Sequence, residues 1–211
     1  MSGLFITLEG PDGSGKSTMI GLIGQYLKEQ GIEHVITREP GGTTIGEKIR
    51  GIIIDRENIN MGPETEALLF AASRAQHVHE KILPAVEEGK VVVCDRFLLS
   101  SLAYQGVGRG LGIQEVRAVN EFGLRGMTPD LILFFHVDPE VTLLRKTKEG
   151  GDRLEEEGGV FHREVYEGYM TLLRMYPDNV VVIDAEKSVE EVYAQTIAAL
   201  TEVLKSKEET L

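Results

Sequence analysis

The chain has 211 residues, of which 42% are hydrophobic and 27% charged, with 34 acidic against 22 basic side chains. This size and mixture predict one globular domain spanning residues 1–211 and exclude an intrinsically disordered chain. The formal net charge of −12 argues against a nucleic-acid binder or a protein that docks on anionic membranes. It does not argue against a small anionic ligand, because a pocket can be basic on an acidic protein.

The single cysteine, Cys94, excludes an intramolecular disulfide and a cysteine cluster that binds zinc. No apolar stretch approaches the roughly 20 residues that a membrane span needs. The first residues lead directly into a short apolar run and do not resemble a signal peptide. We therefore expect a soluble, cytoplasmic protein.

Five short apolar runs predict the strands of a sheet, and the runs lie at residues 4–8, 33–37, 91–94, 131–135 and 180–183. Continuous runs rich in Val and Ile are typical of parallel strands that are buried on both faces. Stretches of helical period separate the runs, at residues 16–30, 45–54, 64–88, 114–125, 139–148, 160–176 and 189–205. Pro84 predicts a kink or break in the third helix. The alternation predicts an α/β fold with three layers, in which helices flank a five-stranded parallel sheet.

The segment Gly10-Pro11-Asp12-Gly13-Ser14-Gly15-Lys16-Ser17 fits the phosphate-binding pattern G-x-x-x-x-G-K-[S/T] at every fixed position. It follows the first predicted strand and begins the first predicted helix, which is the context that a P-loop requires. Glycines allow consecutive backbone N–H groups to point at phosphate oxygens, and the helix N-terminus adds partial positive charge. We expect the loop and Thr18 to bind the phosphates of ATP, with Lys16 on the terminal phosphates and the Ser17 hydroxyl on Mg²⁺.

A P-loop alone indicates a nucleoside triphosphate and leaves several protein classes open. The Asn-Lys-x-Asp motif expected of a GTPase is absent from the sequence. Helicases and transporter ATPases would need a longer chain or a basic surface. Kinases of small metabolites are therefore the class that the sequence favours.

A second acidic strand end lies at Asp95, which is followed by Arg96. The carboxyl ends of neighbouring parallel strands meet at one edge of the sheet, so we expect both residues beside the P-loop. Asp95 could hold Mg²⁺ directly or through water, and Arg96 could bind an oxyanion through its planar, fixed charge. The alternative is an ion pair that only ends the strand.

Further segments identify a family. Residues 37–43 read Thr-Arg-Glu-Pro-Gly-Gly-Thr, residues 69–74 read Leu-Phe-Ala-Ala-Ser-Arg, and residues 101–106 read Ser-Leu-Ala-Tyr-Gln-Gly after the Asp-Arg pair. Asp152-Arg153 is followed by Phe161-His162 and Tyr169. With the P-loop, this order and spacing resemble bacterial thymidylate kinases, which transfer the γ-phosphoryl group of ATP to dTMP with Mg²⁺.

The resemblance implies a dTMP site formed by Asp12, Arg38, Phe70, Arg74, Arg96, Ser101, Tyr104 and Gln105. Phe70 would stack on the thymine ring. Arg74, Ser101 and Gln105 would recognise the edge of the base. Tyr104 would crowd the ribose 2′ position and so favour deoxyribose.

The phosphate end of the site follows from the same resemblance. Arg38 and Arg96 would hold the dTMP phosphate. Asp12 would contact dTMP on the side that carries the 3′-hydroxyl. Some members carry a basic residue inside the P-loop, which this chain lacks, and in such chains an arginine of the lid supplies the charge. Arg153, in a predicted lid at about 149–159, is the first candidate for that arginine.

The implied catalytic residues are therefore Lys16, Arg96, Arg153 and Asp12. Further candidates are Glu9 at the end of the first strand, Arg109 and Arg145. Glu9 could equally satisfy backbone groups. The family forms homodimers through packed helices, and we expect the same here. Two alternatives remain open: a kinase for another nucleotide or a deoxynucleoside, and a non-catalytic nucleotide-binding protein.

Overall fold

All five predicted strands are present in the computed structural model, which describes residues 3–145, 153–154, 156–176 and 178–209. The strands are β1 (Leu4–Glu9), β2 (His34–Arg38), β3 (Val91–Asp95), β4 (Leu131–His136) and β5 (Val180–Asp184). They form one parallel sheet in the order β2-β3-β1-β4-β5. The predicted α/β architecture with a five-stranded parallel sheet is thus confirmed.

The strand order places the sequence motifs side by side. β1 lies in the centre, between β3 and β4, and its register pairs Leu8 with Asp95. The loops that follow β1 and β3 therefore leave the same edge of the sheet at neighbouring positions, which is where ligands bind in open α/β sheets.

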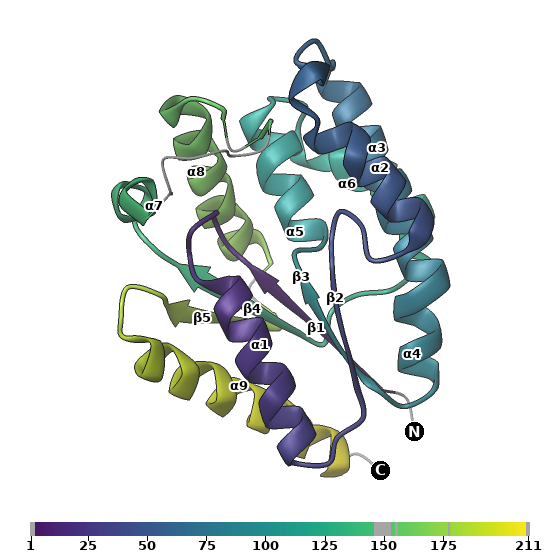
Figure 1. The fold of residues 1–211 in the computed structure, drawn as a ribbon, viewed down its shortest axis with the longest axis vertical. Helices are drawn as coiled ribbons and strands as arrows, with labels where there is room; N and C mark the ends of the chain where they lie inside the picture. The colour runs from purple at the N-terminus through teal and green to yellow at the C-terminus, as the bar shows by residue number, and fades with distance from the viewer. Residues whose placement is uncertain (1–2, 146–152, 155, 177, 210–211) are drawn as a thin grey trace.

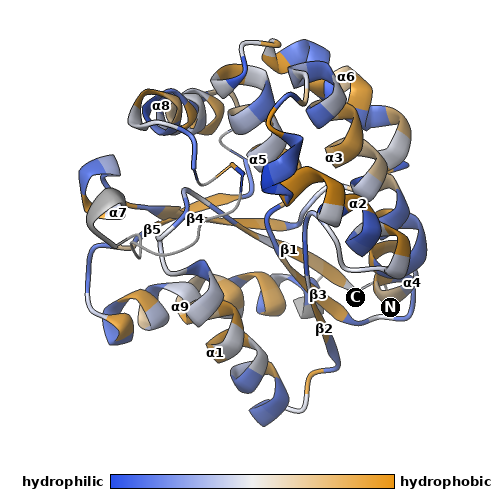
Figure 2. Ribbon diagram, turned by 45° about the horizontal axis from the view of Figure 1, so that its top comes forward, coloured by the Kyte–Doolittle hydropathy of each residue, from blue (hydrophilic) through white to orange (hydrophobic). Residues whose placement is uncertain are grey.

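One face of the sheet is covered by two helices from opposite ends of the chain, α1 (Lys16–Glu29) and α9 (Val189–Glu209). Figures 1 and 2 show α1 and α9 together on this face. Alternate β1 residues such as Ile6 and Leu8 pack against Ile23 and Leu27 of α1. Phe5, which lies between Leu4 and Ile6 in β1, points to the opposite face of the sheet and belongs to a separate apolar cluster there. Burial on both faces explains why the strands read as unbroken apolar runs.

The other helices lie mainly on the opposite face. They are α2 (Thr44–Ile54), α3 (Pro63–His77), α4 (Leu83–Glu87), α5 (Leu98–Ser101), α6 (Ile113–Leu124), α7 (Pro139–Arg145) and α8 (Gly159–Met175). Figure 2 shows α3, α5, α6 and α8 across the sheet from α1 and α9. Within the parts of the chain that are described, no helix is long and apolar enough to cross a membrane.

The helix predicted at 64–88 is interrupted just before Pro84. A π-helical turn, Val78–Ile82, joins α3 to α4, and Pro84 is among the first residues of α4. Proline has no N–H to donate to the carbonyl four residues earlier, and its ring crowds that carbonyl, so a wider turn precedes it.

A helical segment that the sequence did not predict follows β3. It comprises α5 and a π-helical turn at Leu102–Gly108. Gly106 and Gly108 lower the helical propensity of this segment, which concealed it. Gly108 is needed for packing, because a Cβ there would lie 2.8 Å from the Val165 side chain of α8. The segment brings Ser101, Tyr104 and Gln105 to the edge of the sheet that carries the P-loop.

Candidate functional site

The P-loop connects β1 to α1 through backbone conformations that favour glycine. Gly10, Gly13 and Gly15 have φ angles of 135°, 78° and 87°. A Cβ at Gly10 would lie 2.6 Å from the carbonyl oxygen of Phe135. At Gly15 no atom lies within 4 Å of the Cβ position, so this glycine is required for its backbone angle alone. The loop ends at the N-terminus of α1, whose first N–H groups are available to an anion.

Lys16 folds back over this loop. Its Nζ donates to the carbonyl oxygens of Gly10 at 3.0 Å and Pro11 at 2.7 Å, and to Ser14 Oγ at 3.2 Å. Burial and the nearby Arg96 guanidinium lower the pKa of Lys16 to about 8. An anion that replaced these neutral oxygens would favour the charged form of the lysine.

Arg96 joins the P-loop to the segment that follows β3. Its φ of 67° is left-handed, which is uncommon for a residue other than glycine and typical of functional sites. Its Nη2 donates to Asp12 Oδ1 at 2.5 Å, and its Nη1 donates to Ser100 Oγ at 3.0 Å and Tyr169 OH at 3.1 Å. Tyr104 OH donates to the other Asp12 oxygen at 2.9 Å. Although burial would raise it, Arg96 and Lys16 hold the pKa of Asp12 well below its usual range.

Glu9, at the end of β1, contacts the residues that follow Arg96. It is fully buried, and its two oxygens accept from the Phe97 backbone N–H at 2.9 Å and the Ser100 hydroxyl at 2.5 Å. Burial raises the pKa of the Glu9 carboxyl above its usual value. Both oxygens are already hydrogen-bonded, which favours the reading in which Glu9 satisfies local groups.

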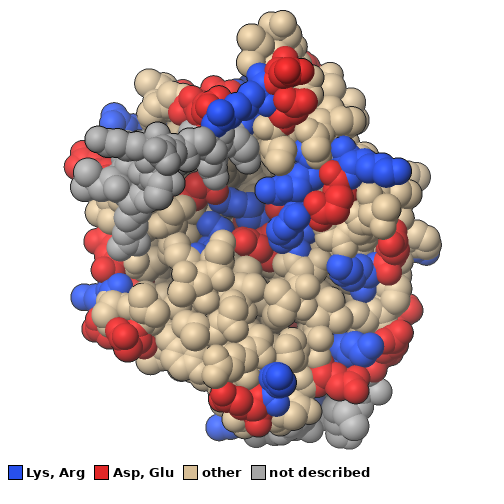
Figure 3. All heavy atoms as spheres, viewed as in Figure 1, with Lys and Arg blue, Asp and Glu red and all other residues tan. Residues whose placement is uncertain are grey.

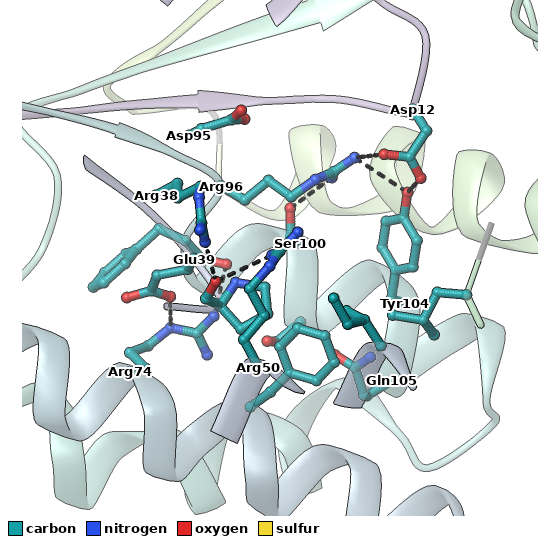
Figure 4. Close-up of a pocket in the computed structure, with 16 residues that line it drawn as sticks. Asp12, Arg38, Glu39, Arg50, Arg74, Asp95, Arg96, Ser100, Tyr104 and Gln105 are labelled. Atoms are coloured by element: carbon teal, nitrogen blue, oxygen red, sulfur yellow. Dashed lines mark hydrogen bonds and ion pairs between the residues drawn. The ribbon is translucent and has the colours of Figure 1, made fainter. Parts of the chain in front are cut away.

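A pocket opens beside this cluster, and all eight predicted dTMP-site residues line it. Figure 3 shows a hollow surrounded by basic side chains, and Figure 4 shows the side chains that point into it. The predicted residues that line it are Asp12, Arg38, Phe70, Arg74, Asp95, Arg96, Ser101, Tyr104 and Gln105. Residues that lie far apart in the sequence thus form one pocket.

Sequence reasoning missed several residues of the same pocket. The additional lining residues are Glu39, Pro40, Arg50, Ile54, Phe97, Ser100 and Leu154. Arg50 is the most informative, because its Nη1 donates to the Pro40 carbonyl at 3.1 Å and adds a fourth arginine to the pocket. Its position on an amphipathic helix gave no signal that separates it from a surface arginine.

Three buried polar atoms at the site have no hydrogen-bond partner among the residues described. They are Ser101 Oγ, Gln105 Oε1 and Asp95 Oδ1. Buried polar atoms are nearly always satisfied, so these three indicate places where a ligand or an ion belongs. Ser101 and Gln105 line the pocket, and Asp95 also lines an adjoining hollow together with Ser17.

Arg74 is the least exposed of the four arginines that line the pocket. It is 2% exposed and donates to Glu39 Oε2 at 2.7 Å, to the Phe97 carbonyl at 2.9 Å and to Asn120 Oδ1. Glu39 also accepts from His77 at 2.9 Å. A guanidinium has five N–H donors, so two remain for a ligand in the pocket.

Arg38 is at the rim of the pocket. Its side chain is 45% exposed and contacts Glu47 at 3.0 Å and the Pro40 carbonyl at 2.9 Å. A half-exposed ion pair of this kind is weak, so the guanidinium can exchange Glu47 for another anion.

Arg153 does not contact the P-loop in this structure. Its Nη2 donates to Glu66 Oε2 at 2.7 Å and its Nε to the Ile53 carbonyl at 2.8 Å. Arg109 contacts the same carboxylate, with Nη2 at 3.0 Å from Glu66 Oε2. Of the predicted lid, residues 149–152 and 155 lie outside the described part of the chain, as does the side chain of Arg145. The catalytic role of Arg153 stays a prediction.

Comparison with known proteins identifies relatives along almost the whole chain. The sequence profile of the family described as thymidylate kinase matches residues 8–196. The chain is 59% identical over 198 residues to a thymidylate kinase of Finegoldia magna, covering 93% of this chain and 97% of that one. It is 50% identical to a thymidylate kinase of Clostridium novyi, with 92% and 96% covered, and 47% identical to one of a Geobacillus species, with 98% and 100% covered.

Proposed function

We propose, from the premise that this chain belongs to the thymidylate kinase family, that its arginine-lined pocket binds dTMP and its P-loop binds the phosphates of ATP. The enzyme transfers the γ-phosphoryl group of ATP to dTMP and releases dTDP and ADP. The observation that carries the assignment is the Asp12–Arg96–Tyr104 cluster, which lies where the P-loop and the pocket meet.

The phosphate of dTMP fits the end of the pocket that Arg38, Arg50 and Arg96 line. Arg96 is 17% exposed in its side chain and fixed by Asp12, so it is oriented before the ligand arrives. Phosphoryl transfer depends on in-line positioning and on neutralising the charge of the transferred group. Lys16 on the donor side and Arg96 on the acceptor side supply that charge. A phosphate oxygen of dTMP is already nucleophilic, so no strong general base is needed.

The base of dTMP fits the other end of the pocket. Phe70 offers an apolar surface for the ring, and the unpartnered Ser101 Oγ and Gln105 Oε1 are available to its polar edge. The two free N–H donors of Arg74 suit a carbonyl oxygen of the base. Tyr104 closes the pocket between base and phosphate, where a ribose 2′-hydroxyl would need space.

We propose that Mg²⁺ is held by the Ser17 hydroxyl and by Asp95, directly or through water. Both residues line one hollow, and Asp95 Oδ1 is buried without a partner. Within the described ranges, no group of three or more His, Cys, Asp or Glu side chains is arranged so that it could hold a metal ion by itself. Mg²⁺ commonly uses one or two carboxylates and completes its coordination with water and substrate phosphates. When bound, it would neutralise charge on the ATP phosphates.

A catalytic role for Arg153 requires that its side chain exchange Glu66 for the phosphates of the reacting complex. The role stays a proposal. It is supported by the P-loop of this chain, which lacks the additional basic residue that some family members carry there, so that an arginine of the lid would supply the missing positive charge. That the enzyme acts in the cytoplasm is likewise a prediction.

We also propose that the enzyme is a homodimer through α2, α3 and α6. These helices carry large apolar side chains at the surface, among them Ile45, Ile52, Leu68, Val119 and Phe122, with Phe122 96% exposed. Exposed apolar side chains that gather on neighbouring helices are typical of an interface.

Side-by-side turnover with ATP tests the function. We expect dTMP to have a higher kcat/KM than dUMP, CMP, AMP or thymidine. A different preferred monophosphate would identify another nucleotide kinase, preference for thymidine would identify a nucleoside kinase, and binding without turnover would identify a non-catalytic relative.

A further inference from the structure

Glu66 is a buried carboxylate that the proposed reaction does not use. It lies on α3 one turn before Phe70 and is 1% exposed. Its Oε1 accepts from the Gln105 amide Nε2 at 2.9 Å and from Arg109 Nε at 3.2 Å. Its Oε2 accepts from Arg109 Nη2 at 3.0 Å and from Arg153 Nη2 at 2.7 Å. The carboxylate therefore connects α3 with two later parts of the chain.

The two arginines keep Glu66 ionised. Burial alone would raise its pKa, but hydrogen bonds from Arg109, Gln105 and Arg153 hold that pKa below the usual value. An ionised carboxylate accepts hydrogen bonds and cannot donate one.

This chemistry determines how the Gln105 amide is oriented. The amide nitrogen must face Glu66, because the reverse orientation would place two oxygens against each other at hydrogen-bond distance. The orientation follows from the charge of Glu66 and not from the assignment of the amide atoms, which are hard to distinguish by shape. Gln105 Oε1 is then the atom left over, and it is buried, unpartnered and part of a side chain that lines the pocket.

We propose that Glu66 is a specificity-determining positioning residue, which holds Gln105 so that the pocket offers a hydrogen-bond acceptor to the base and never a donor. The proposal rests on the proposed placement of dTMP in this pocket. Thymine carries an N–H at ring position 3, whereas cytosine carries a lone pair there. If the Gln105 amide cannot rotate, its oxygen accepts a hydrogen bond from the thymine N–H and repels the lone pair of cytosine. Glu66 thus acts on base selection through Gln105, without contacting the substrate.

The test compares dTMP with dCMP as the ratio of their kcat/KM values, measured in the full-length enzyme. In Glu66→Gln the neighbour of Gln105 can donate as well as accept, so the Gln105 amide can turn over. We expect the ratio to fall by about tenfold or more, since hydrogen-bonding sites discriminate strongly against mismatched groups. Thymine stays the better base in this variant, because Arg74 still favours a carbonyl oxygen.

Two further variants separate this effect from general damage. Glu157→Gln removes another carboxylate that contacts Arg109, at 2.6 Å, without touching Gln105, and should leave the ratio unchanged. Gln105→Ala should lower the ratio by itself. In the Gln105→Ala background, Glu66→Gln should lower it no further, because residues that act through one contact are not additive.

Equal loss of activity toward dTMP and dCMP in Glu66→Gln would overturn the proposal and leave Glu66 a structural residue. A further fall of the ratio in the double variant would overturn it as well. If Glu66→Gln does not fold, an unchanged ratio in Gln105→Ala still overturns the proposal, because the Gln105 oxygen would then not recognise the base. Failure of the proposed function would give a different result. The wild-type enzyme itself would then not prefer dTMP in the side-by-side turnover measurement described above.

Discussion

Three cations of the site differ in what their side chains already contact. Among the described residues, Lys16 donates only to neutral oxygens. Arg96 is paired with Asp12, and Arg74 is enclosed by Glu39 and its neighbours. A buried cation without a carboxylate gains most from an incoming anion, whereas an enclosed one mainly keeps its geometry. We therefore assign the strongest response to ATP to Lys16, and a positioning contribution to Arg74.

The pH dependence of ATP binding tests this view of Lys16. Its pKa of about 8 in the free protein means that it is charged below pH 8 and neutral above. Bound phosphates stabilise the charged form, so the pKa rises on binding. The affinity for ATP should then be nearly constant well below pH 8 and fall as the pH rises through that value, approaching about tenfold per pH unit above it.

Titration calorimetry at several pH values between about 7.5 and 9.5 checks this expectation. Lys16→Met is the control and should bind weakly with little dependence on pH across the same range. Equal affinity of the wild-type enzyme at the two ends of the range would show that the charge of Lys16 does not contribute.

Tyr104 offers a second test at this scale. Its ring lines the pocket, while its hydroxyl donates to Asp12. Tyr104→Ala removes the ring and should raise the kcat/KM of the ribose analogue of dTMP relative to dTMP by about tenfold, a typical effect of a small steric change in a pocket. Tyr104→Phe keeps the ring and should retain most of the discrimination. If the two variants discriminate alike, the ring does not exclude the 2′-hydroxyl.

Reasoning from the residues alone predicted those whose spacing has a local cause, and the family resemblance supplied the more distant ones. The P-loop reads as a motif because its glycines, lysine and serine follow one another along the chain. Glu66, Gln105, Arg109 and Arg153 form one network although 43 and 87 positions separate Glu66 from the two arginines. No periodicity couples such positions, so their contacts emerge only from the fold.

At the scale of elements, the strands were predicted well and the helical segments less so. Strands buried on both faces require continuous apolar runs, and each predicted strand lies within about one residue of the observed one. The π-helical turns at Val78–Ile82 and Leu102–Gly108 have no such signature. They depend on Pro84 and on the fit of Gly108 against α8, and the second of them carries Tyr104 and Gln105.

The packing of α6 on α3 depends on a glycine and makes a prediction about stability. A Cβ at Gly123 would lie 2.6 Å from the Ala75 Cβ. Gly123→Ala should push these helices apart and lower the free energy of unfolding by about 1–3 kcal/mol, as overpacking usually does.

Gly21 of α1 is the matched control, since no atom lies within 4 Å of its Cβ position. Gly21→Ala should leave the stability unchanged or raise it by about 0.5–1 kcal/mol, because alanine is the better helix former. Urea unfolding measures both variants. A Gly123→Ala protein as stable as the wild type would mean that the two helices adjust without strain.

At the scale of the whole molecule, the acidic chain and its basic pocket are compatible because the charges are segregated. The net charge is −12, yet four arginines line one pocket. Acidic partners such as Asp12 and Glu39 hold individual arginines in place without filling the pocket. A local positive field in a cleft raises the concentration of an anionic substrate there, whatever the sign of the total charge.

The proposed homodimer makes a prediction at the same scale. Phe122→Asp places a charge where the apolar faces of two copies would meet. The variant should be monomeric at micromolar concentration, whereas we expect the wild-type enzyme to be dimeric. Light scattering after size exclusion gives the mass directly, and the exposed position of Phe122 means that the fold should be unaffected. A wild-type mass of one chain would refute the dimer.

The structure of the enzyme with dTMP and a non-hydrolysable ATP analogue tests the central claim most directly. The account predicts the thymine ring against Phe70 with its N–H on Gln105 Oε1, and the dTMP phosphate on Arg96. It predicts the γ-phosphate of the analogue on Lys16, facing the dTMP phosphate in line. A dTMP phosphate bound away from Arg96, or a base outside the Phe70 pocket, would contradict it.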